Sequence, residues 1–402
     1  RPGVLVPLGL ILVIVLAYCG VALFWPLTAI PPQAAVVSVT PAAAPAAAIH
    51  WPAAGSAAVS VRGIPGSPAS TSAAAPIASI TKLVTALTVL DQMPLQVGQQ
   101  GPLFHFTYAD HREYVQYTWR NESALDVPVG GTLSEYQLLQ GMLIGSASNY
   151  AARLAGNLWP TDAVFANAAN TWLQQHGVSG ITVVDPTGFE YGNVATPAGL
   201  MALAQKALEN PVIAQIVGMA SVDLPGAGHV VNTNELLSDA GVIGVKTGTL
   251  DGYDLLAAKQ VKIGSTTVTM YATTLRQPDD KTRWASTRAL FAQLESELQL
   301  RPSVTAGTVA GEVTTRWGET VDVVTRQDAD VVLWNGGSAK VSSTFALGSK
   351  DKGAWKKGAT AGALTTTGPL DQATVPLVLA RTIQGPSPLW RLTHPLELLG
   401  LS

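Results

Sequence analysis

The sequence predicts a chain of the α/β (α+β) class, in which a transmembrane helix precedes a mixed domain and a small all-β domain follows it. Three observations predict this arrangement. Residues 4–25 form an apolar run, residues 80–87 carry the apolar spacing of a helix, and short segments of alternating polarity fill much of residues 302–384. At about 150 residues per domain, the 402 residues suffice for two globular domains and an anchor or linker.

The composition excludes several classes of protein. Charged residues make up 13% of the chain and hydrophobic residues 47%, whereas disordered chains are rich in charge and poor in apolar residues. The net charge of −3 would repel phosphate backbones, so we expect no nucleic-acid partner. Cys19 is the only cysteine, which excludes an intrachain disulfide and a cysteine-based zinc site.

The N-terminal segment indicates export. No charged residue lies between Arg1 and Arg62, and the 22 residues Val4–Trp25 are almost wholly apolar. In a helix they would span roughly 33 Å, enough to cross a hydrocarbon core of about 30 Å. We expect residues 1–30 to be an uncleaved membrane anchor. The alternative is a cleaved signal peptide, whose apolar core usually has only about 7–15 residues.

Residues 31–54 are rich in alanine and proline. Because proline stiffens a chain toward polyproline II, we expect an extended spacer that holds the next domain away from the membrane. The alternative is a passive tail.

The larger domain is expected over residues 55–300, and its first motif lies on a helix. Apolar residues recur at the i, i+3, i+4 and i+7 positions that give a helix one buried face: Ile80, Leu83, Val84 and Leu87. Ser79 opens this helix, and Lys82 lies three positions later, where its amine can reach the serine hydroxyl. A hydroxyl becomes a nucleophile when a base takes its proton, and lysine becomes that base when burial lowers its pKa from about 10.4. A second S-x-x-K, Ser349–Lys352, lies in a charged segment that we interpret as a solvated loop.

A second motif, Lys246-Thr247-Gly248 followed by Thr249, ends a segment with the composition of a strand. A cation and hydroxyl groups on a strand beside a serine nucleophile can bind a substrate carboxylate, and Gly248 allows close approach of the backbone. The alternative is a strand end with an exposed lysine.

Between these motifs lies a helix–loop–helix pattern that carries Ser146, Ser148 and Asn149 in its loop. A hydroxyl there can relay protons between Lys82 and a leaving group.

Together the three motifs resemble the signature set of penicillin-binding proteins and serine β-lactamases. The segments PIASITKLVTALTVLD, MLIGSASNYAARLA, DPTGFEYGNVATP and VKTGT are most similar to the low-molecular-mass serine D-Ala-D-Ala carboxypeptidases of bacteria, over roughly residues 54–300. The resemblance implies a β-lactamase/transpeptidase-like domain, in which an antiparallel sheet is flanked by helices.

The resemblance also implies roles for residues. Ser79 corresponds to the acyl-enzyme nucleophile, Lys82 to the general base and Ser146 to a proton relay. The substrate carboxylate would be held at the second motif, by Lys246, Thr247, Gly248 and Thr249.

One position departs from the family pattern. The loop motif is usually S-x-N, whereas this chain has Ser146-Ala147-Ser148, with serine where asparagine would contact the substrate amide. Asn149 would replace it only if the loop shifted by one residue. A lost hydrogen bond with a buried partner costs about 1–3 kcal/mol, so we expect a working but slower enzyme, with a degenerate pseudo-enzyme as the alternative.

Other features predict little chemistry. No histidine spacing suits a metal, so we expect no metal and no cofactor. Glu190, in a segment that faintly resembles the deacylating loop of class A β-lactamases, is interpreted as an ordinary loop residue. The aromatic and charged run of residues 104–119 alternates as strands do.

The last part of the chain, residues 301–402, is expected to form a β-rich domain with an apolar tail that packs back on the body. The alternative is a tail that lies on a membrane. The domain carries no catalytic motif, so spacing or partner contact is its expected role.

The sequence therefore predicts a serine D-Ala-D-Ala carboxypeptidase that trims peptidoglycan stem pentapeptides through an acyl-enzyme. We expect a single-pass protein of the bacterial cell membrane with its catalytic domain outside the cytoplasm. Its expected partners are stem peptides, β-lactam antibiotics as covalent inhibitors, and the membrane itself. The alternatives are a serine β-lactamase and a catalytically impaired wall-binding homologue.

Overall fold

The computed structural model describes residues 2–27, 32–347 and 355–401, which fold into two compact units. The mixed unit comprises Ala47–Leu298, and the β-rich unit comprises Arg1–Ala46 together with Gln299–Ser402. The domain bounds expected from the sequence, residues 55–300 and residues 301–402, remain predictions. The second S-x-x-K, Ser349–Lys352, lies outside the described residues.

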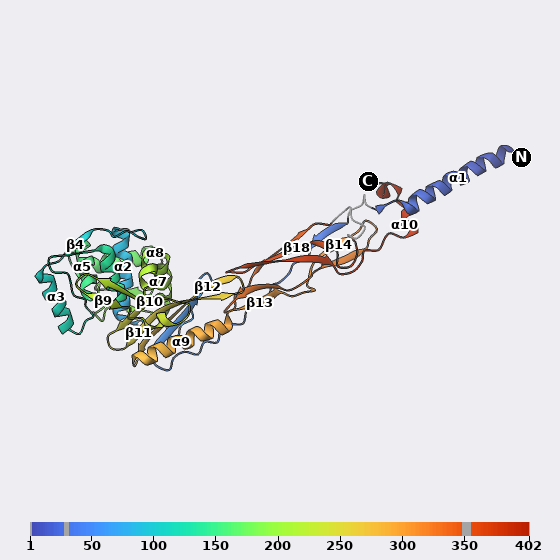
Figure 1. Ribbon diagram of the computed structural model, residues 1–402. Coiled ribbons are helices and arrows are strands. Elements are labelled where there is room, and N and C mark those ends of the chain that lie inside the picture. The colour runs from blue at the N-terminus through green and yellow to red at the C-terminus, as the bar shows by residue number, and fades with distance from the viewer. Residues whose placement is uncertain (1, 28–31, 348–354, 402) are drawn as a thin grey trace. The chain divides into compact units, whose positions relative to one another are not determined.

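A four-stranded antiparallel sheet forms the centre of the mixed unit. Its strand order is β10-β11-β12-β2, with bounds Val242–Thr249, Tyr253–Ile263, Thr266–Gln277 and Ser56–Val61. The middle strands bury runs of small and aliphatic residues such as Leu255–Ala258, as expected for a sheet that is covered on both faces. Figure 1 shows α9 (Asp280–Glu297) along one side of this sheet and α7 (Pro197–Glu209) on the other.

The predicted helix over residues 80–87 is α2, Thr81–Gln92, preceded by the 3₁₀ turn η2, Ala78–Ile80. Ten of its twelve residues are buried, because helices pack around it on several sides. Those that contact it are α4 (Glu135–Ile144), α5 (Ser148–Leu158), α6 (Asp162–Gln175) and α7. Burial of α2 on all sides fixes Ser79 and Lys82 at one end of the helical layer.

The alternating run of residues 104–119 does not form the expected strands. Only Leu103–His105 is a strand, β4, and Tyr108–Trp119 is the helix α3. Thr107 and Asp110 form a capping box at its start, which favours a helix, and none of the twelve α3 residues is buried. The alternation of aromatic residues in this run therefore does not correspond to one face of a sheet.

Short elements complete the mixed unit. They are β3 (Ala75–Pro76), β5 (Thr132–Ser134), β6 (Ile181–Thr182), β7 (Val194–Ala195), α8 (Pro211–Val217), β8 (Ser221–Leu224), β9 (Gly228–Val231) and η3 (Glu235–Ser238).

The β-rich unit confirms the prediction of a strand-rich C-terminal region. A six-stranded sheet has the order β1-β14-β15-β19-β18-β17, and β13 pairs with β16. Their bounds are Gln33–Val36, Val309–Thr314, Thr320–Thr325, Gln372–Leu379, Thr360–Thr367 and Lys340–Phe345 for the sheet, with Gln299–Val304 and Ala329–Leu333 for the pair.

The segment expected to be a spacer takes part in this unit. Strand β1 pairs antiparallel with β14, from Gln33 opposite Thr314 to Val36 opposite Gly311. The stretch of residues 33–40 contains no proline, so its N–H groups are available for a ladder. Further along, Ala42 N donates to Ser303 O at 2.8 Å.

The N-terminal helix α1, Pro2–Phe24, is long and apolar enough to cross a membrane between Gly3 and Phe24, a property that a signal sequence shares. Its hydrophobic side chains are largely exposed. The tail packs against its end through α10 (Pro388–Thr393) and α11 (Pro395–Leu398), as Arg391 Nη1 donates to Trp25 O at 2.9 Å.

Candidate active site

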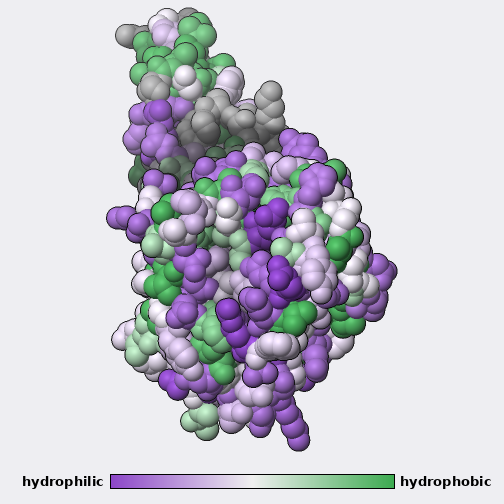
Figure 2. Space-filling view, turned by 90° about the vertical axis from the view of Figure 1, so that its left-hand side faces the viewer, coloured by the Kyte–Doolittle hydropathy of each residue, from purple (hydrophilic) through white to green (hydrophobic). Residues whose placement is uncertain are grey.

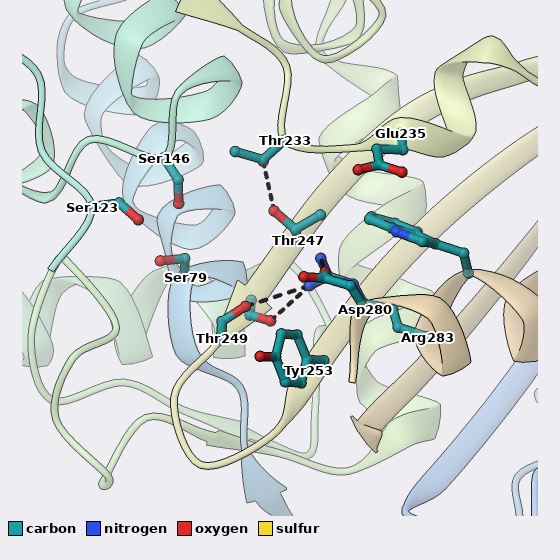
Figure 3. Close-up of a pocket in the computed structure, with 12 residues that line it drawn as sticks. Ser79, Ser123, Ser146, Thr233, Glu235, Thr247, Thr249, Tyr253, Asp280 and Arg283 are labelled. Carbon is teal, nitrogen blue, oxygen red and sulfur yellow. Dashed lines mark hydrogen bonds and ion pairs between the residues drawn. The ribbon is translucent and has the colours of Figure 1, made fainter. Parts of the chain in front are cut away.

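Segments that are far apart in the sequence line one pocket of about 350 Å³ in the mixed unit. Figure 3 shows Ser79, Ser123 and Ser146 together on one side of it, across from Thr247, Thr249 and Arg283. The remaining lining residues are Thr233, Glu235, Gly248, Tyr253, Asp280 and Trp284. Figure 2 shows the face of this unit as a mixture of hydrophilic and hydrophobic residues.

Ser79 and Lys82 are in direct contact, with 2.8 Å between Lys82 Nζ and Ser79 Oγ. Lys82 is fully buried, and burial lowers its pKa to about 7, although Asp185 and Glu122 act in the opposite direction. A substantial fraction of Lys82 is therefore neutral near pH 7, as a proton acceptor must be.

The loop of residues 185–193 holds the lysine from behind. Lys82 Nζ donates to Thr187 O at 2.6 Å. Asp185 fixes this loop, because its carboxylate accepts from Thr187 N at 2.8 Å and Gly188 N at 3.2 Å, and it also bonds the Asn193 amide. A Cβ on Gly188 would lie 2.0 Å from Ala78 O, so only glycine allows the loop to approach the nucleophile turn this closely.

The serine loop reaches both lysines. Lys246 Nζ donates to Ser146 Oγ at 3.0 Å, and Lys82 Nζ donates to Ser148 Oγ at 3.2 Å. Asn149 is directed elsewhere, since its side chain bonds Leu125 N at 3.1 Å and Leu125 O at 2.7 Å. The loop register is thus Ser146-Ala147-Ser148, and Asn149 does not take the place of Ser148.

Lys246 lies on β10 and is buried. Its Nζ also donates to Thr247 O at 3.1 Å, and burial, with Lys82 and Arg283 nearby, holds its pKa well below the usual value. Gly248 passes close to the nucleophile turn, since a Cβ there would lie 2.8 Å from Ile77 O. Thr249 is exposed at the pocket rim.

Arg283 on α9 is a pocket residue that the sequence motifs did not predict. Its Nη1 donates to Gly248 O at 3.2 Å and Asp254 O at 3.1 Å, and it lies 3.5 Å from Thr249 Oγ1. The guanidinium carbon lies 4.2 Å from the centre of the Trp284 ring. Its buried Nε has no hydrogen-bond partner within the part of the chain that the structure describes. No local sequence signal marks an arginine that reaches the pocket from a helix.

The arrangement combines a serine hydroxyl, a lysine able to accept its proton, and a wall that presents the Arg283 guanidinium and hydroxyl groups, with the Lys246 amine directly behind it. Such a site can carry out acyl transfer on a substrate that ends in a carboxylate. All eight predicted site residues lie at or directly behind this pocket: Ser79, Lys82, Ser146, Ser148, Lys246, Thr247, Gly248 and Thr249.

Comparisons with known proteins agree with a site of this kind. A family model described as D-alanyl-D-alanine carboxypeptidase matches residues 69–274. A D-alanyl-D-alanine endopeptidase of Pseudomonas aeruginosa is 31% identical over 140 residues, which span 35% of this chain and 42% of that protein. This chain therefore matches less than half the length of that relative.

Solved structures share the fold. A mutant of the Streptomyces K15 DD-transpeptidase is 23% identical, with a TM-score of 0.53 over 60% of this chain and 98% of that one. A peptidoglycan synthesis regulatory factor from Streptococcus pneumoniae is 19% identical, with a TM-score of 0.54 over 82% of this chain and 99% of that one. A penicillin-binding protein from Listeria monocytogenes in a cefotaxime-bound form is 22% identical, with a TM-score of 0.50 over 61% of this chain and 98% of that one.

Proposed function

Because the chain belongs to the D-alanyl-D-alanine carboxypeptidase family, whose members are serine D-Ala-D-Ala peptidases, we propose that it removes the terminal D-alanine from peptidoglycan stem pentapeptides. The observation that carries the proposal is the 2.8 Å contact between Ser79 Oγ and Lys82 Nζ, together with the lowered pKa of the lysine.

Acylation begins when neutral Lys82 takes the proton of the Ser79 hydroxyl, whose oxygen attacks the carbonyl carbon of the penultimate D-alanine. The peptide C–N bond then breaks, and the proton on Lys82 passes through Ser146 to the leaving amine, so that Lys82 is neutral again. Water next attacks the ester carbonyl and gives a proton to Lys82, which returns it to Ser79 Oγ as the ester C–O bond breaks.

The terminal carboxylate of the substrate is proposed to bind beside Lys246 and Arg283. Lys246 is buried, and Arg283 has a guanidinium group in contact with Thr249. Charge-assisted hydrogen bonds to these groups would favour a peptide that ends at its second D-alanine over one that continues. Such a preference would be that of a carboxypeptidase and not of an endopeptidase.

A β-lactam would enter the same site and acylate Ser79. This part of the proposal is supported by the Listeria protein of the same fold, which has been solved in a cefotaxime-bound form. We also propose that α1 tethers the chain to the bacterial cell membrane, with the mixed unit outside the cytoplasm.

The test is release of D-alanine from a stem pentapeptide by the full chain in detergent. We expect free D-alanine from the pentapeptide and none with Ser79→Ala. A cross-linked peptide dimer and a penicillin serve as parallel substrates. Cleavage of the dimer faster than of the pentapeptide would favour an endopeptidase. Rapid hydrolysis of the penicillin would favour a β-lactamase. Absence of turnover on every substrate would favour an impaired homologue.

A further inference from the structure

Ser123 is a pocket residue to which the proposed mechanism gives no role. Of the three serines that Figure 3 shows on this side of the pocket, Ser79 is the nucleophile and Ser146 accepts a hydrogen bond from Lys246. The Ser123 side chain is exposed, and its hydroxyl makes no hydrogen bond within the part of the chain that the structure describes. A hydroxyl that lines a pocket without a protein partner is available to a ligand.

The two neighbouring candidates in the serine loop face away from the pocket. Ser148 is only 4% exposed and accepts from Lys82 Nζ, and Asn149 is 7% exposed and bonds the backbone of Leu125. Neither of them lines the pocket. Neither side chain is therefore placed to contact the substrate amide, as asparagine at position 148 would in the family pattern.

The start of α5 instead fixes the segment that carries Ser123. Its first three residues each donate a hydrogen bond to a carbonyl oxygen of this segment: Ser148 N to Ser123 O at 2.8 Å, Asn149 Nδ2 to Leu125 O at 2.7 Å, and Tyr150 Oη to Asp126 O at 2.7 Å. A side chain on a segment that is already ordered loses less conformational entropy when it binds a ligand. Ser123 is thus held in place at the pocket wall.

The order of residues across the pocket indicates which part of a substrate reaches Ser123. Figure 3 shows Ser123 on the opposite side of Ser79 from Arg283. When the terminal carboxylate lies beside Lys246 and Arg283 and the reacting carbonyl lies at Ser79, the rest of the peptide extends past the nucleophile toward Ser123. The first polar group in that direction is the amide that joins the penultimate D-alanine to the residue before it.

We propose that Ser123 is a substrate-binding residue whose hydroxyl donates a hydrogen bond to the carbonyl oxygen of this amide. The inference rests on the proposed function, because acylation at Ser79 sets the position of the peptide. A hydroxyl has the one donor hydrogen that such a bond requires. Ser123 thereby supplies the amide contact that Ser148 and Asn149 do not make.

The test compares two penicillins that differ in the equivalent carbonyl group. Benzylpenicillin carries an acylamino side chain on its β-lactam ring, and 6-aminopenicillanic acid has a free amine in its place. We expect Ser123→Ala in the full chain to lower the second-order rate constant of acylation by benzylpenicillin about three- to tenfold, because one hydrogen bond between neutral groups is lost. The rate constant for 6-aminopenicillanic acid should change less than about twofold, since this compound lacks the carbonyl oxygen.

Two further variants complete the comparison. Ser123→Thr keeps the hydroxyl and should keep the rate constant for benzylpenicillin within about twofold of the wild-type value. Ser179→Ala is the matched control, because it removes an exposed serine hydroxyl of the same unit that does not line the pocket. It should leave the rate constants for both penicillins unchanged.

Equal losses for the two penicillins in Ser123→Ala would overturn the proposal, since a structural role of Ser123 affects both alike. An unchanged rate constant for benzylpenicillin, or a loss that Ser123→Thr does not restore, would overturn it as well. A wild-type chain that neither penicillin acylates would reject the proposed function and this inference with it, so the two failures are distinguishable.

Discussion

Lys246 Nζ and Ser146 Oγ lie 3.0 Å apart although 100 positions separate the two residues in the sequence. This bond closes the pocket between the serine loop and β10. It also orients the Ser146 hydroxyl. Lys246 Nζ is the donor and Ser146 Oγ the acceptor, so this bond does not use the hydroxyl hydrogen of Ser146. The proton of Ser146 is then free to serve a leaving group.

Ser146→Ala removes this hydroxyl without changing the backbone, and we expect the acylation rate to fall about 100-fold. The buried amine of Lys246 would also lose one acceptor, which adds a modest loss of stability. Stopped-flow acylation by a chromogenic β-lactam measures the first effect and thermal unfolding the second. A Ser146→Ala enzyme at wild-type rate would rule out the relay.

The pH dependence of acylation follows from Lys82. Only neutral Lys82 can accept the Ser79 proton, and its pKa is lowered to about 7. The rate should therefore rise as the pH rises through about 7 and level off above it. Lys82→Arg should lose about 10²- to 10⁴-fold at every pH, because arginine does not give up its proton. A rate that is constant across this range would contradict the assignment of Lys82 as base.

Gly188→Ala tests how tightly the loop of residues 185–193 supports the nucleophile. Gly188 has a φ of +82°, and a Cβ there would lie 2.0 Å from Ala78 O. We expect a loss of more than about 2 kcal/mol in the free energy of unfolding, with slower acylation as the turn before Ser79 shifts.

Gly177→Ala is the matched control, because Gly177 has a φ of +69° but nothing within 4 Å of its Cβ position. It should cost only about 1 kcal/mol and leave acylation unchanged. Equal effects of the two substitutions in denaturant titrations would show that backbone conformation, rather than the close approach to Ala78, is what matters.

Arg283→Gln removes the guanidinium charge at the pocket wall. We expect kcat/KM for a peptide with a free terminal carboxylate to fall about tenfold or more, as a charge-assisted hydrogen bond is lost. The same peptide with an amidated C-terminus lacks the anion and serves as the control. If both peptides lose the same factor, Arg283 supports β10 and does not recognise the carboxylate.

Much of this fold and site was predictable because its signals are local. The apolar positions of residues 80–87 follow the helical repeat. The two lysine motifs, Ser79–Lys82 and Lys246–Gly248, are short sequences whose residue types indicate their chemistry. The helix of residues 81–92, the strand before Lys246 and the strand-rich C-terminal region all follow from such patterns.

What was missed depends on tertiary contacts. Arg283 enters the pocket from α9 only after the chain folds, so it has no sequence signal. Residues 108–119 alternate like a strand, yet the capping box at Thr107 produces an exposed helix. Residues 33–36 join a sheet edge because a partner strand is present, which composition alone did not reveal.

The most direct measurement is to locate the covalent adduct. The full chain is treated with a fluorescent penicillin, digested, and the labelled peptide is identified by mass spectrometry. We expect one adduct, on the hydroxyl of Ser79, and none in Ser79→Ala. An adduct on another residue, or D-alanine release that persists in Ser79→Ala, would contradict it.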